Sequence, residues 1–233
     1  MGPGEDHRRR PRPAARPRVQ CVTQQRVSRV VTVSPERLDR WLSNFGERHG
    51  DVSFAVAPHQ VTVSAVDGTI AVVEVPFQPL ADLTREGLIA HVLADHRLGV
   101  LLVRRGGYGA GVFVGAELVD SKVGSRHVQG TTKAGGWSQQ RFARRRDNQA
   151  REAFAAATEV AVRILAPARL QALVCGGDRR AIETVLEDPR LKELPGLIRP
   201  PFLGVPDPKQ KVLEQAGVDA RAIRIELTDP QEL

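Results

Sequence analysis

The fold is decided by residues 170–187, LQALVCGGDRRAIETVLE, which join a short apolar run to a helical pattern. The run Leu170–Cys175 is continuously apolar over its second half, as expected of a buried strand. Asp178 then stands where an N-cap residue begins a short helix over about 179–187. Just before the stretch, Pro167 ends a longer helical pattern. A strand between two helices predicts an α/β fold.

The longer helical pattern before Pro167 predicts a helix over roughly 139–166. Its apolar residues recur at the 3.6-residue period on one face: Phe142, Ala150, Ala153, Ala157, Ala161 and Ile164. One apolar face is what a helix needs to pack on a sheet.

Upstream, the pattern changes from helices to strands that follow one another as hairpins. We predict strands at 30–33, 52–57, 60–66, 69–75, 100–104, 112–114 and 116–123. Asp67-Gly68 is a strong two-residue turn between two of them. The glycine-rich stretch 106–111 is predicted to be a turn between strands, because a dinucleotide-binding loop would need a helix after it.

Three further helices complete the predicted order of elements. Ser34-Pro35 begins one that stops near Gly46 to Gly50, and Thr84 caps another that runs to about His96. Leu88, Val92 and Leu93 should face inward from the second. After the proline-rich connector 195–208, a last helix over 206–216 and a last strand over 222–227 follow.

These elements predict one α/β domain over 25–233, a mixed β-sheet with packed helices. Residues 1–24 are predicted to be a disordered basic tail, since they are rich in Arg and Pro and poor in large apolar residues. Two cysteines without a CxxC pair, no apolar run of membrane-spanning length and no signal-peptide core favour a cytoplasmic protein.

The charge of the chain points to an anionic partner. The formal net charge is +7 and the pI is near 10.2. Between Lys122 and Arg146 the sequence holds no Asp or Glu, and its basic residues there are Lys122, Arg126, Lys133, Arg141, Arg144, Arg145 and Arg146. A run of one sign can be a solvated face, but this run surrounds a glycine loop, so we expect an RNA-facing patch.

The glycine loop carries the candidate chemistry. The sequence GGWSQQRFARRR at 135–146 joins Gly135 and Gly136 to the amides of Gln139 and Gln140 at the start of the long helix. Glycines allow positive φ and close approach. The arginines that follow lie where the helix dipole is already positive, which is unfavourable unless an anion is near. Trp137 could stack on a nucleotide or anchor the loop on its own domain.

The run Gly-Gly-x-Ser-x-x-Arg-Phe-Ala-Arg at 135–144 resembles the Gly-Gly-Gln loop and helix of eukaryotic and archaeal class-1 peptide-chain release factors. Trp137 stands where those factors have glutamine. The spacing Gly136-Trp137-Ser138-Gln139 is closer to the Gly-x-x-Gln of the Vms-like release factors, including actinobacterial members. The resemblance implies an RNase H-like fold of the release-factor middle-domain type.

The resemblance also implies an activity, which is codon-independent hydrolysis of peptidyl-tRNA on stalled or split large ribosomal subunits. Gln139, or Gln140 if the loop is shifted by one residue, would orient water for attack on the ester. The partners would be the large subunit, peptidyl-tRNA and rRNA, with no cofactor or metal, and we expect a monomer. The alternatives are a non-catalytic RNA- or ribosome-binding module and, with less support, a metal-dependent nuclease.

Overall fold

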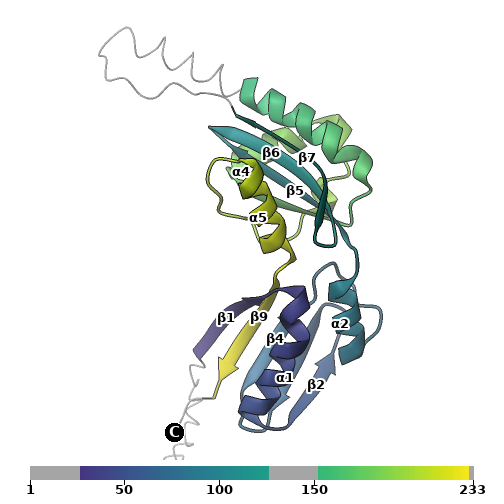
Figure 1. Ribbon diagram of the computed structural model, residues 1–233, viewed down its shortest axis with the longest axis vertical. Coiled ribbons are helices and arrows are strands. Elements are labelled where there is room, and N and C mark those ends of the chain that lie inside the picture. Colours follow the sequence, from purple (N-terminus) through teal and green to yellow (C-terminus); the bar gives the residue numbers. More distant parts are fainter. Residues whose placement is uncertain (1–26, 126–151, 231–233) are drawn as a thin grey trace, which may run out of the picture.

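The computed structural model describes residues 27–125 and 152–230, which build two β-sheets that follow one another along the long axis of the molecule (Figure 1). Sheet A has five strands, and every neighbouring pair in it is antiparallel. Their order across the sheet is β1 (Val27–Val33), β9 (Ile223–Asp229), β4 (Ile70–Glu74), β3 (Gln60–Ala65) and β2 (Val52–Val56). The chain therefore begins and ends its described part in the same sheet.

Sheet B is formed by the middle of the chain and is mixed. Its strands in spatial order are β7 (Glu117–Ser125), β6 (Gly107–Val114), β5 (Arg97–Arg104) and β8 (Ala172–Gly177). β5 and β8 are parallel, and the other neighbours are antiparallel. The predicted mixed sheet with packed helices is confirmed in sheet B, whereas the separate antiparallel sheet A was not predicted.

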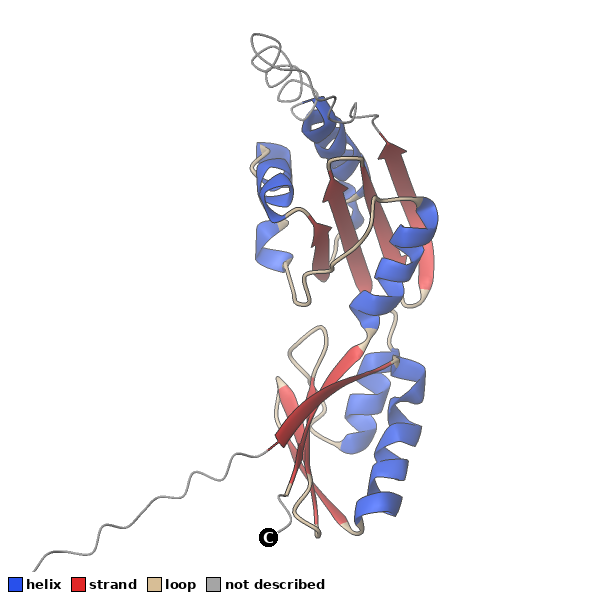
Figure 2. Ribbon diagram, turned by 90° about the vertical axis from the view of Figure 1, so that its left-hand side faces the viewer, coloured by secondary structure: helices blue, strands red, loops and turns tan. Residues whose placement is uncertain are grey.

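Sheet A packs its helices on one face (Figure 2). The helices are η1 (Pro35–Arg37), α1 (Leu38–His49) and α2 (Arg85–Leu93). Leu38, Leu42 and Phe45 of α1 share a core with alternate strand residues such as Val61 and Val63. Alternation of buried and more exposed residues along β3 and β9 agrees with a sheet that is buried on one side.

Sheet B is covered on both faces. A helix over 152–164 and α4 (Arg179–Leu186) lie on one face, and α5 (Gln210–Arg221) lies on the other. Along β5, Leu101 and Val103 join the first core, and Leu98, Val100 and Leu102 join the second. Three short 3-10 helices, η2 (Ala166–Ala168), η3 (Pro189–Leu191) and η4 (Pro195–Leu197), connect these layers.

Several local predictions are confirmed by hydrogen bonds. Thr84 Oγ1 accepts from Gly87 N at 2.9 Å, and Asp178 Oδ1 accepts from Arg180 N at 3.0 Å, so both residues are N-caps. Asp67 and Gly68 lie in the turn between β3 and β4, with Gly68 at φ 89°. Ala153, Ala157, Ala161 and Ile164 are buried on one helix face as predicted.

Other local predictions were wrong at element ends. α2 stops at Leu93, not near His96, because His96 folds back and its Nε2 lies 2.7 Å from the His91 carbonyl oxygen. Leu93 is 49% exposed and does not face the core. Ser34 makes no side-chain cap and leads into η1, so α1 begins only at Leu38.

The glycine-rich stretch predicted as a turn is mostly strand. Only residues 105–106 turn, and β6 begins at Gly107. A Cβ at Gly109 would lie 3.1 Å from Val123, and one at Gly111 would lie 3.0 Å from Leu118, so the neighbouring side chains use the space that the glycines leave. Pro208 packs on the same strand, and α5 begins after it at Gln210 and runs to Arg221, not over 206–216.

The prediction of one domain over 25–233 concerns independent folding and stays a prediction. Sheet A has its own core, and sheet B has a core on each face. Two connections join the sheets, the segment before β5 and the step from α5 to β9. Within the described ranges, no helix is both long and apolar enough to cross a membrane.

Candidate RNA-facing site at one end of sheet B

Most of the predicted site residues lie in the segment 126–151, outside the described residues. These are Arg126, Lys133, Gly135, Gly136, Trp137, Gln139, Gln140, Arg141, Arg144, Arg145 and Arg146. Lys122 is described, and it is an exposed residue of β7 that pairs with Ala110 of β6. The structure describes the strands and the helix that flank the segment 126–151.

The elements that flank the segment 126–151 meet at one end of sheet B. β7 ends at Ser125, which pairs with Gly107 at the start of β6, and the helix over 152–164 begins near the same end (Figure 1). β5 and β8 also finish there, since Val103 pairs with Gly177 in the last rung of their parallel ladder. We call this end the site end. It also holds the start of α4 and the chain that leads into α5.

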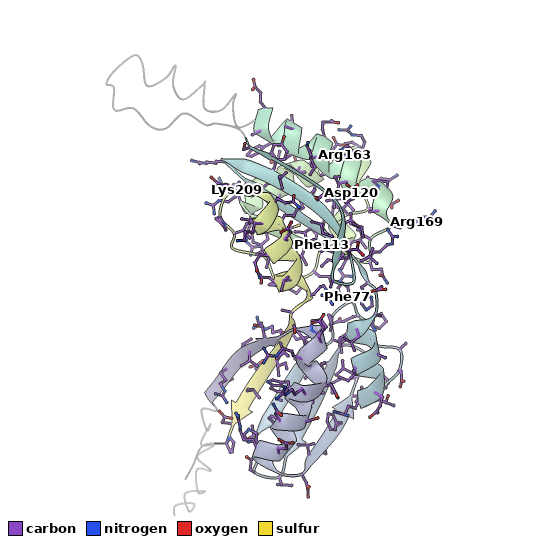
Figure 3. The ribbon with its side chains drawn as sticks, viewed as in Figure 1. Phe77, Phe113, Asp120, Arg163, Arg169 and Lys209 are labelled. Atoms are coloured by element: carbon purple, nitrogen blue, oxygen red, sulfur yellow. The ribbon has the colours of Figure 1, made fainter. Side chains whose placement is uncertain are left out.

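Exposed cations gather at the site end from three elements that are far apart in the sequence. We call them the basic rim: Arg104, Arg105, Arg179, Arg180 and Lys209. The first two lie at the tip of the β5–β6 hairpin, and the next two open α4. Lys209 is the N-cap position of α5 and lies at its upper end in the view of Figure 3. The rim therefore lies where the segment 126–151 leaves the sheet.

Two of the rim arginines also hold the loop that precedes α5. Arg104 Nη1 donates to the Val205 carbonyl at 2.6 Å, and its Nε lies 3.5 Å from Asp207 Oδ1. A Cβ at Gly106 would overlap the Asp207 carboxylate, so a side chain there would displace that carboxylate. Arg179 lies 4.1 Å above the ring of Phe202, a cation–π contact.

The remaining rim cations face solvent. Arg105, Arg180 and Lys209 form no ion pair with any residue in the described ranges. Arg180 lies in the first turn of α4, where the helix dipole disfavours a cation. Cations without a described ion pair at such a place favour an anionic partner such as a phosphate backbone.

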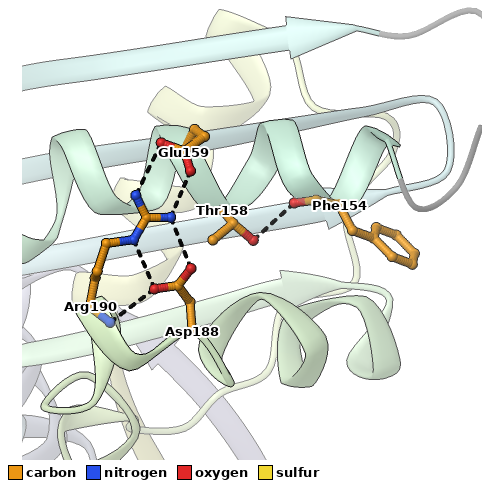
Figure 4. A network of polar contacts seen from close by, with 5 residues as sticks. All are labelled: Phe154, Thr158, Glu159, Asp188 and Arg190. Carbon is orange, nitrogen blue, oxygen red and sulfur yellow. Dashed lines mark hydrogen bonds and ion pairs between the residues drawn. The ribbon is translucent and has the colours of Figure 1, made fainter.

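The helix over 152–164 is tied down on its outer side by one arginine (Figure 4). Arg190 Nη2 lies 2.6 Å from Glu159 Oε1, and its Nε and Nη2 each donate to Asp188 at 2.9 Å. These contacts lower the pKa of Asp188 to about 2 and hold the pKa of Glu159 below its ordinary value. The helix that follows the candidate loop is thus fixed to η3.

The carboxylates and the cysteine that the structure describes do not form the metal site that a nuclease would need. Asp67 lies in the turn between β3 and β4, Glu74 lies in β4 of sheet A, and Glu117 and Asp120 lie in β7 of sheet B, so the structure does not bring these four carboxylates together. In the described part of the chain, no group of three or more His, Cys, Asp or Glu residues could hold a metal. Burial raises the pKa of the Cys175 thiol to about 12.

The basic rim was missed in the sequence because no local pattern unites its members. The pair Arg179-Arg180, which follows the buried strand after the N-cap Asp178, was the available signal, since strand ends at one edge of a sheet meet. The parallel pairing of β5 with β8, which brings Arg104 near Arg179, depends on strands about 70 residues apart in the chain.

The comparisons with known proteins concern the same part of the chain. The family model described as "Actinobacteria/chloroflexi VLRF1 release factor" matches residues 96–226, more than half of the 233 residues. This range begins at sheet B and ends inside β9. No curated protein matches the chain.

Solved structures give distant matches. An archaeal protein is 16% identical, with 66% of this chain and 48% of that chain covered and a TM-score of 0.35. The archaeal translation termination factor aRF1 is 14% identical, with 81% and 70% covered and a TM-score of 0.37. The Vms1 mitochondrial localization core is 8% identical, with 81% and 80% covered and a TM-score of 0.43. The chain thus spans about half the length of the first of these proteins.

Proposed function

The chain belongs to the Actinobacteria/chloroflexi VLRF1 release factor family, which gives it a role in peptide release or rescue at the ribosome, and we propose that it hydrolyses peptidyl-tRNA on the large subunit. The observation that carries the proposal is where the family match falls. The matched range 96–226 includes the loop from Gly135 to Gln140 with its basic surroundings.

The chemistry needs little from the protein. A peptidyl-tRNA ester is activated, and the reaction lacks an oriented water and a group that stabilises the developing oxyanion. The amide of Gln139 accepts and donates hydrogen bonds and can orient the water without a charged base. Gly135 and Gly136 let the backbone come close to the acceptor end of the tRNA. Gln140 takes the same role if the loop is shifted by one residue.

We assign the binding of rRNA and tRNA to the basic run from Lys122 to Arg146 together with the basic rim. Support comes from the site end of sheet B, where the rim and both flanks of the segment 126–151 occur together. Phosphate groups of rRNA and of the tRNA are the anions that such a surface fits. We further propose a cytoplasmic monomer that needs no metal or cofactor of its own.

The experiment that tests the proposal is release from defined substrate. The full chain is incubated with purified large subunits that carry labelled peptidyl-tRNA, and free peptide is scored against intact tRNA. Puromycin on the same subunits is the control that the ester is accessible. Free peptide with intact tRNA is the expected result. Cleaved tRNA would indicate a nuclease and contradict the proposal.

A second candidate is a ribosome-binding module without catalysis. It is favoured by Trp137, which stands where class-1 release factors carry glutamine. In the release experiment this candidate predicts that the protein sediments with the large subunits while the peptide stays on the tRNA.

A further inference from the structure

A groove runs between α1 and the edge of sheet A, outside the range 96–226 that the family model matches. It consists of two cavities of about 240 and 450 Å³. Both are lined by Val31 of β1 and by Trp41 and Asn44 of α1. β1 is an edge strand of sheet A, because its one partner in the described chain is β9. The groove therefore has a strand edge on one side and a helix on the other.

Periodicity explains which side chains line the helix side. Positions 37, 41, 44 and 48 recur at three- and four-residue spacing and share one face from the N-cap of α1 to its last turn. The cavities are lined by these residues, by Arg40 and by Arg29 from β1. Trp41 is half-buried, and Arg37, Arg40, Asn44 and Arg48 are exposed.

Four arginines line the groove, and one of them, Arg29, lies 3.9 Å from Asp229 Oδ2. Arg37, Arg40 and Arg48 form no ion pair with any residue in the part of the chain that the structure describes. Two of the three acids next to them are paired with other residues, since Glu36 pairs with Arg221 at 3.0 Å and Asp39 with Arg85 at 2.6 Å. Glu47 is the one acid of η1 and α1 without such a described pair. Guanidinium groups along one groove that have no described ion pair favour an anionic ligand.

Trp41 gives the groove a rigid aromatic surface. Its ring stacks on Phe45 with centroids 5.6 Å apart and planes 18° apart. Phe45 in turn contacts His49 with centroids 4.8 Å apart. A tryptophan whose ring is already packed against another ring loses little side-chain conformational entropy when a planar group stacks on its other face. Beside it, the amide of Asn44 can both donate to and accept from a base edge.

We propose that this groove binds single-stranded RNA, with a base stacked on Trp41 and phosphates paired with Arg37, Arg40 and Arg48. Alternating cations and an aromatic surface are what sequence-tolerant binding of single strands requires. An acidic extended peptide that adds a strand to β1 would use the arginines, but it would have no need of Trp41 or Asn44. The observations therefore favour RNA.

The sequence offers a direct probe, because the chain has only two tryptophans. In full-length protein carrying Trp137→Phe, all tryptophan fluorescence comes from Trp41. An oligouridylate of about 12 nucleotides is added, within the range that one single-strand site covers. We expect saturable quenching of Trp41 and protection from iodide. If labelled oligouridylate binds, as measured by anisotropy, while Trp41 fluorescence stays unchanged, the proposal is wrong.

Two further ligands separate the alternatives. Double-stranded RNA with the same number of phosphates should quench Trp41 less, because its bases are already stacked. Equal quenching by the duplex would contradict stacking on Trp41. An acidic peptide of similar length should leave the signal unchanged. Quenching by the peptide but not by oligouridylate would assign the groove to a protein partner and overturn the proposal.

Charge variants test the phosphate contacts. Replacing Arg40→Gln and Arg48→Gln should weaken binding and reduce the salt slope by about 0.7 for each lost contact. The matched control is Arg163→Gln with Lys192→Gln, which removes the same charge from exposed positions near sheet B. Trp41→Leu, checked for folding by circular dichroism, should lower affinity on the order of ten-fold. If both double variants lose the same affinity for oligouridylate, the loss comes from net charge alone, and the proposal is contradicted.

These measurements use RNA alone, so their outcome is independent of peptide release. A chain that binds oligouridylate at Trp41 but releases no peptide would contradict the proposed hydrolase and support the groove. A chain that releases peptide without quenching of Trp41 would do the reverse.

Discussion

Sheet B is covered by helices on both faces, whereas sheet A packs helices on one. The difference is visible along single strands, since the six inner residues of β5 are all buried and β3 alternates. Sheet B is therefore packed from two sides along β5, although β7, the edge strand from which the segment 126–151 leaves, has no buried residue. Residues built on a packed sheet are held more accurately than residues on a half-covered one.

The basic rim on sheet B and the groove on sheet A differ in how many elements supply their cations. The rim on sheet B collects cations from a hairpin tip and two helix starts, so it exists only when the fold is complete. The groove on sheet A takes most of its cations from one helix and its N-cap. The rim is a product of tertiary structure, and the groove is mainly a product of helical periodicity.

The largest expected effect is the loss of stability when a buried leucine is truncated in a core of either sheet. Leu173 is fully buried in sheet B and Leu42 almost fully beneath sheet A. Leu173→Ala and Leu42→Ala should each cost about 2–5 kcal/mol, because both side chains are buried and truncation leaves a cavity. Urea unfolding followed by circular dichroism measures both.

The same pair of variants tests the single domain predicted over 25–233. In the Trp137→Phe background, Trp41 reports on sheet A alone, since it lies in α1. For a single domain, Leu173→Ala should shift the Trp41 transition as much as the circular dichroism transition. A Trp41 transition that stays at the wild-type urea concentration would show two domains.

The next effect concerns close packing on the α5 face of sheet B. A Cβ at Gly217 would overlap the ring of Phe113, so Gly217→Ala should cost about 1–3 kcal/mol although alanine favours helices. Gly196→Ala is the control, because nothing lies within 4 Å of its Cβ position. If both variants melt alike, α5 is not packed as closely on the sheet as described.

A smaller effect is expected at the basic rim. Arg105→Gln with Arg180→Gln should weaken binding to large subunits and lower the salt slope by about one unit for each lost phosphate contact. The free energy of unfolding should change by less than about 0.5 kcal/mol, because neither arginine has a described ion pair. Arg163→Gln with Lys192→Gln controls for charge in a sedimentation assay. Equal binding by the two double variants would remove the rim from the interface.

The smallest effect is a pH dependence at the outer side of sheet B. Arg190 lowers the pKa values of Asp188, to about 2, and of Glu159, so their contribution to stability is present above about pH 4.5 and is lost as the pH falls towards 2. Arg190→Gln should therefore be less stable than wild type at pH 5, with a difference that shrinks towards pH 2. The measurement is urea unfolding at both values. A difference independent of pH would mean that the arginine acts through packing.

The sequence predicted what neighbouring residues decide. The caps at Thr84 and Asp178, the turn at Asp67-Gly68 and the buried strand near 170–175 depend on side chains a few residues apart. It did not predict that β9 inserts between β1 and β4, which joins β1 to β2, β3 and β4 in a sheet separate from β5–β8. That pairing joins residues almost 200 positions apart, and no local pattern records it.

The glycine-rich stretch also shows that local sequence does not predict long-range packing. The stretch 106–111 is read as a turn because glycine disfavours strands. In the fold it is strand, since Leu118, Val123 and Pro208 fill the space that the glycines leave. For the candidate site, the sequence identified the loop and its charge, and the rim required the parallel pairing of β5 with β8.

The central claim is that an amide carried at the site end of sheet B performs release. The direct measurement is single-turnover peptide release from large subunits by wild type, Gln139→Ala and Gln140→Ala, with subunit binding measured in parallel. We expect Gln139→Ala to be about 10²–10³ times slower with unchanged binding. A slow Gln140→Ala beside a normal Gln139→Ala would shift the loop by one residue. Release at the wild-type rate by both variants would contradict the account.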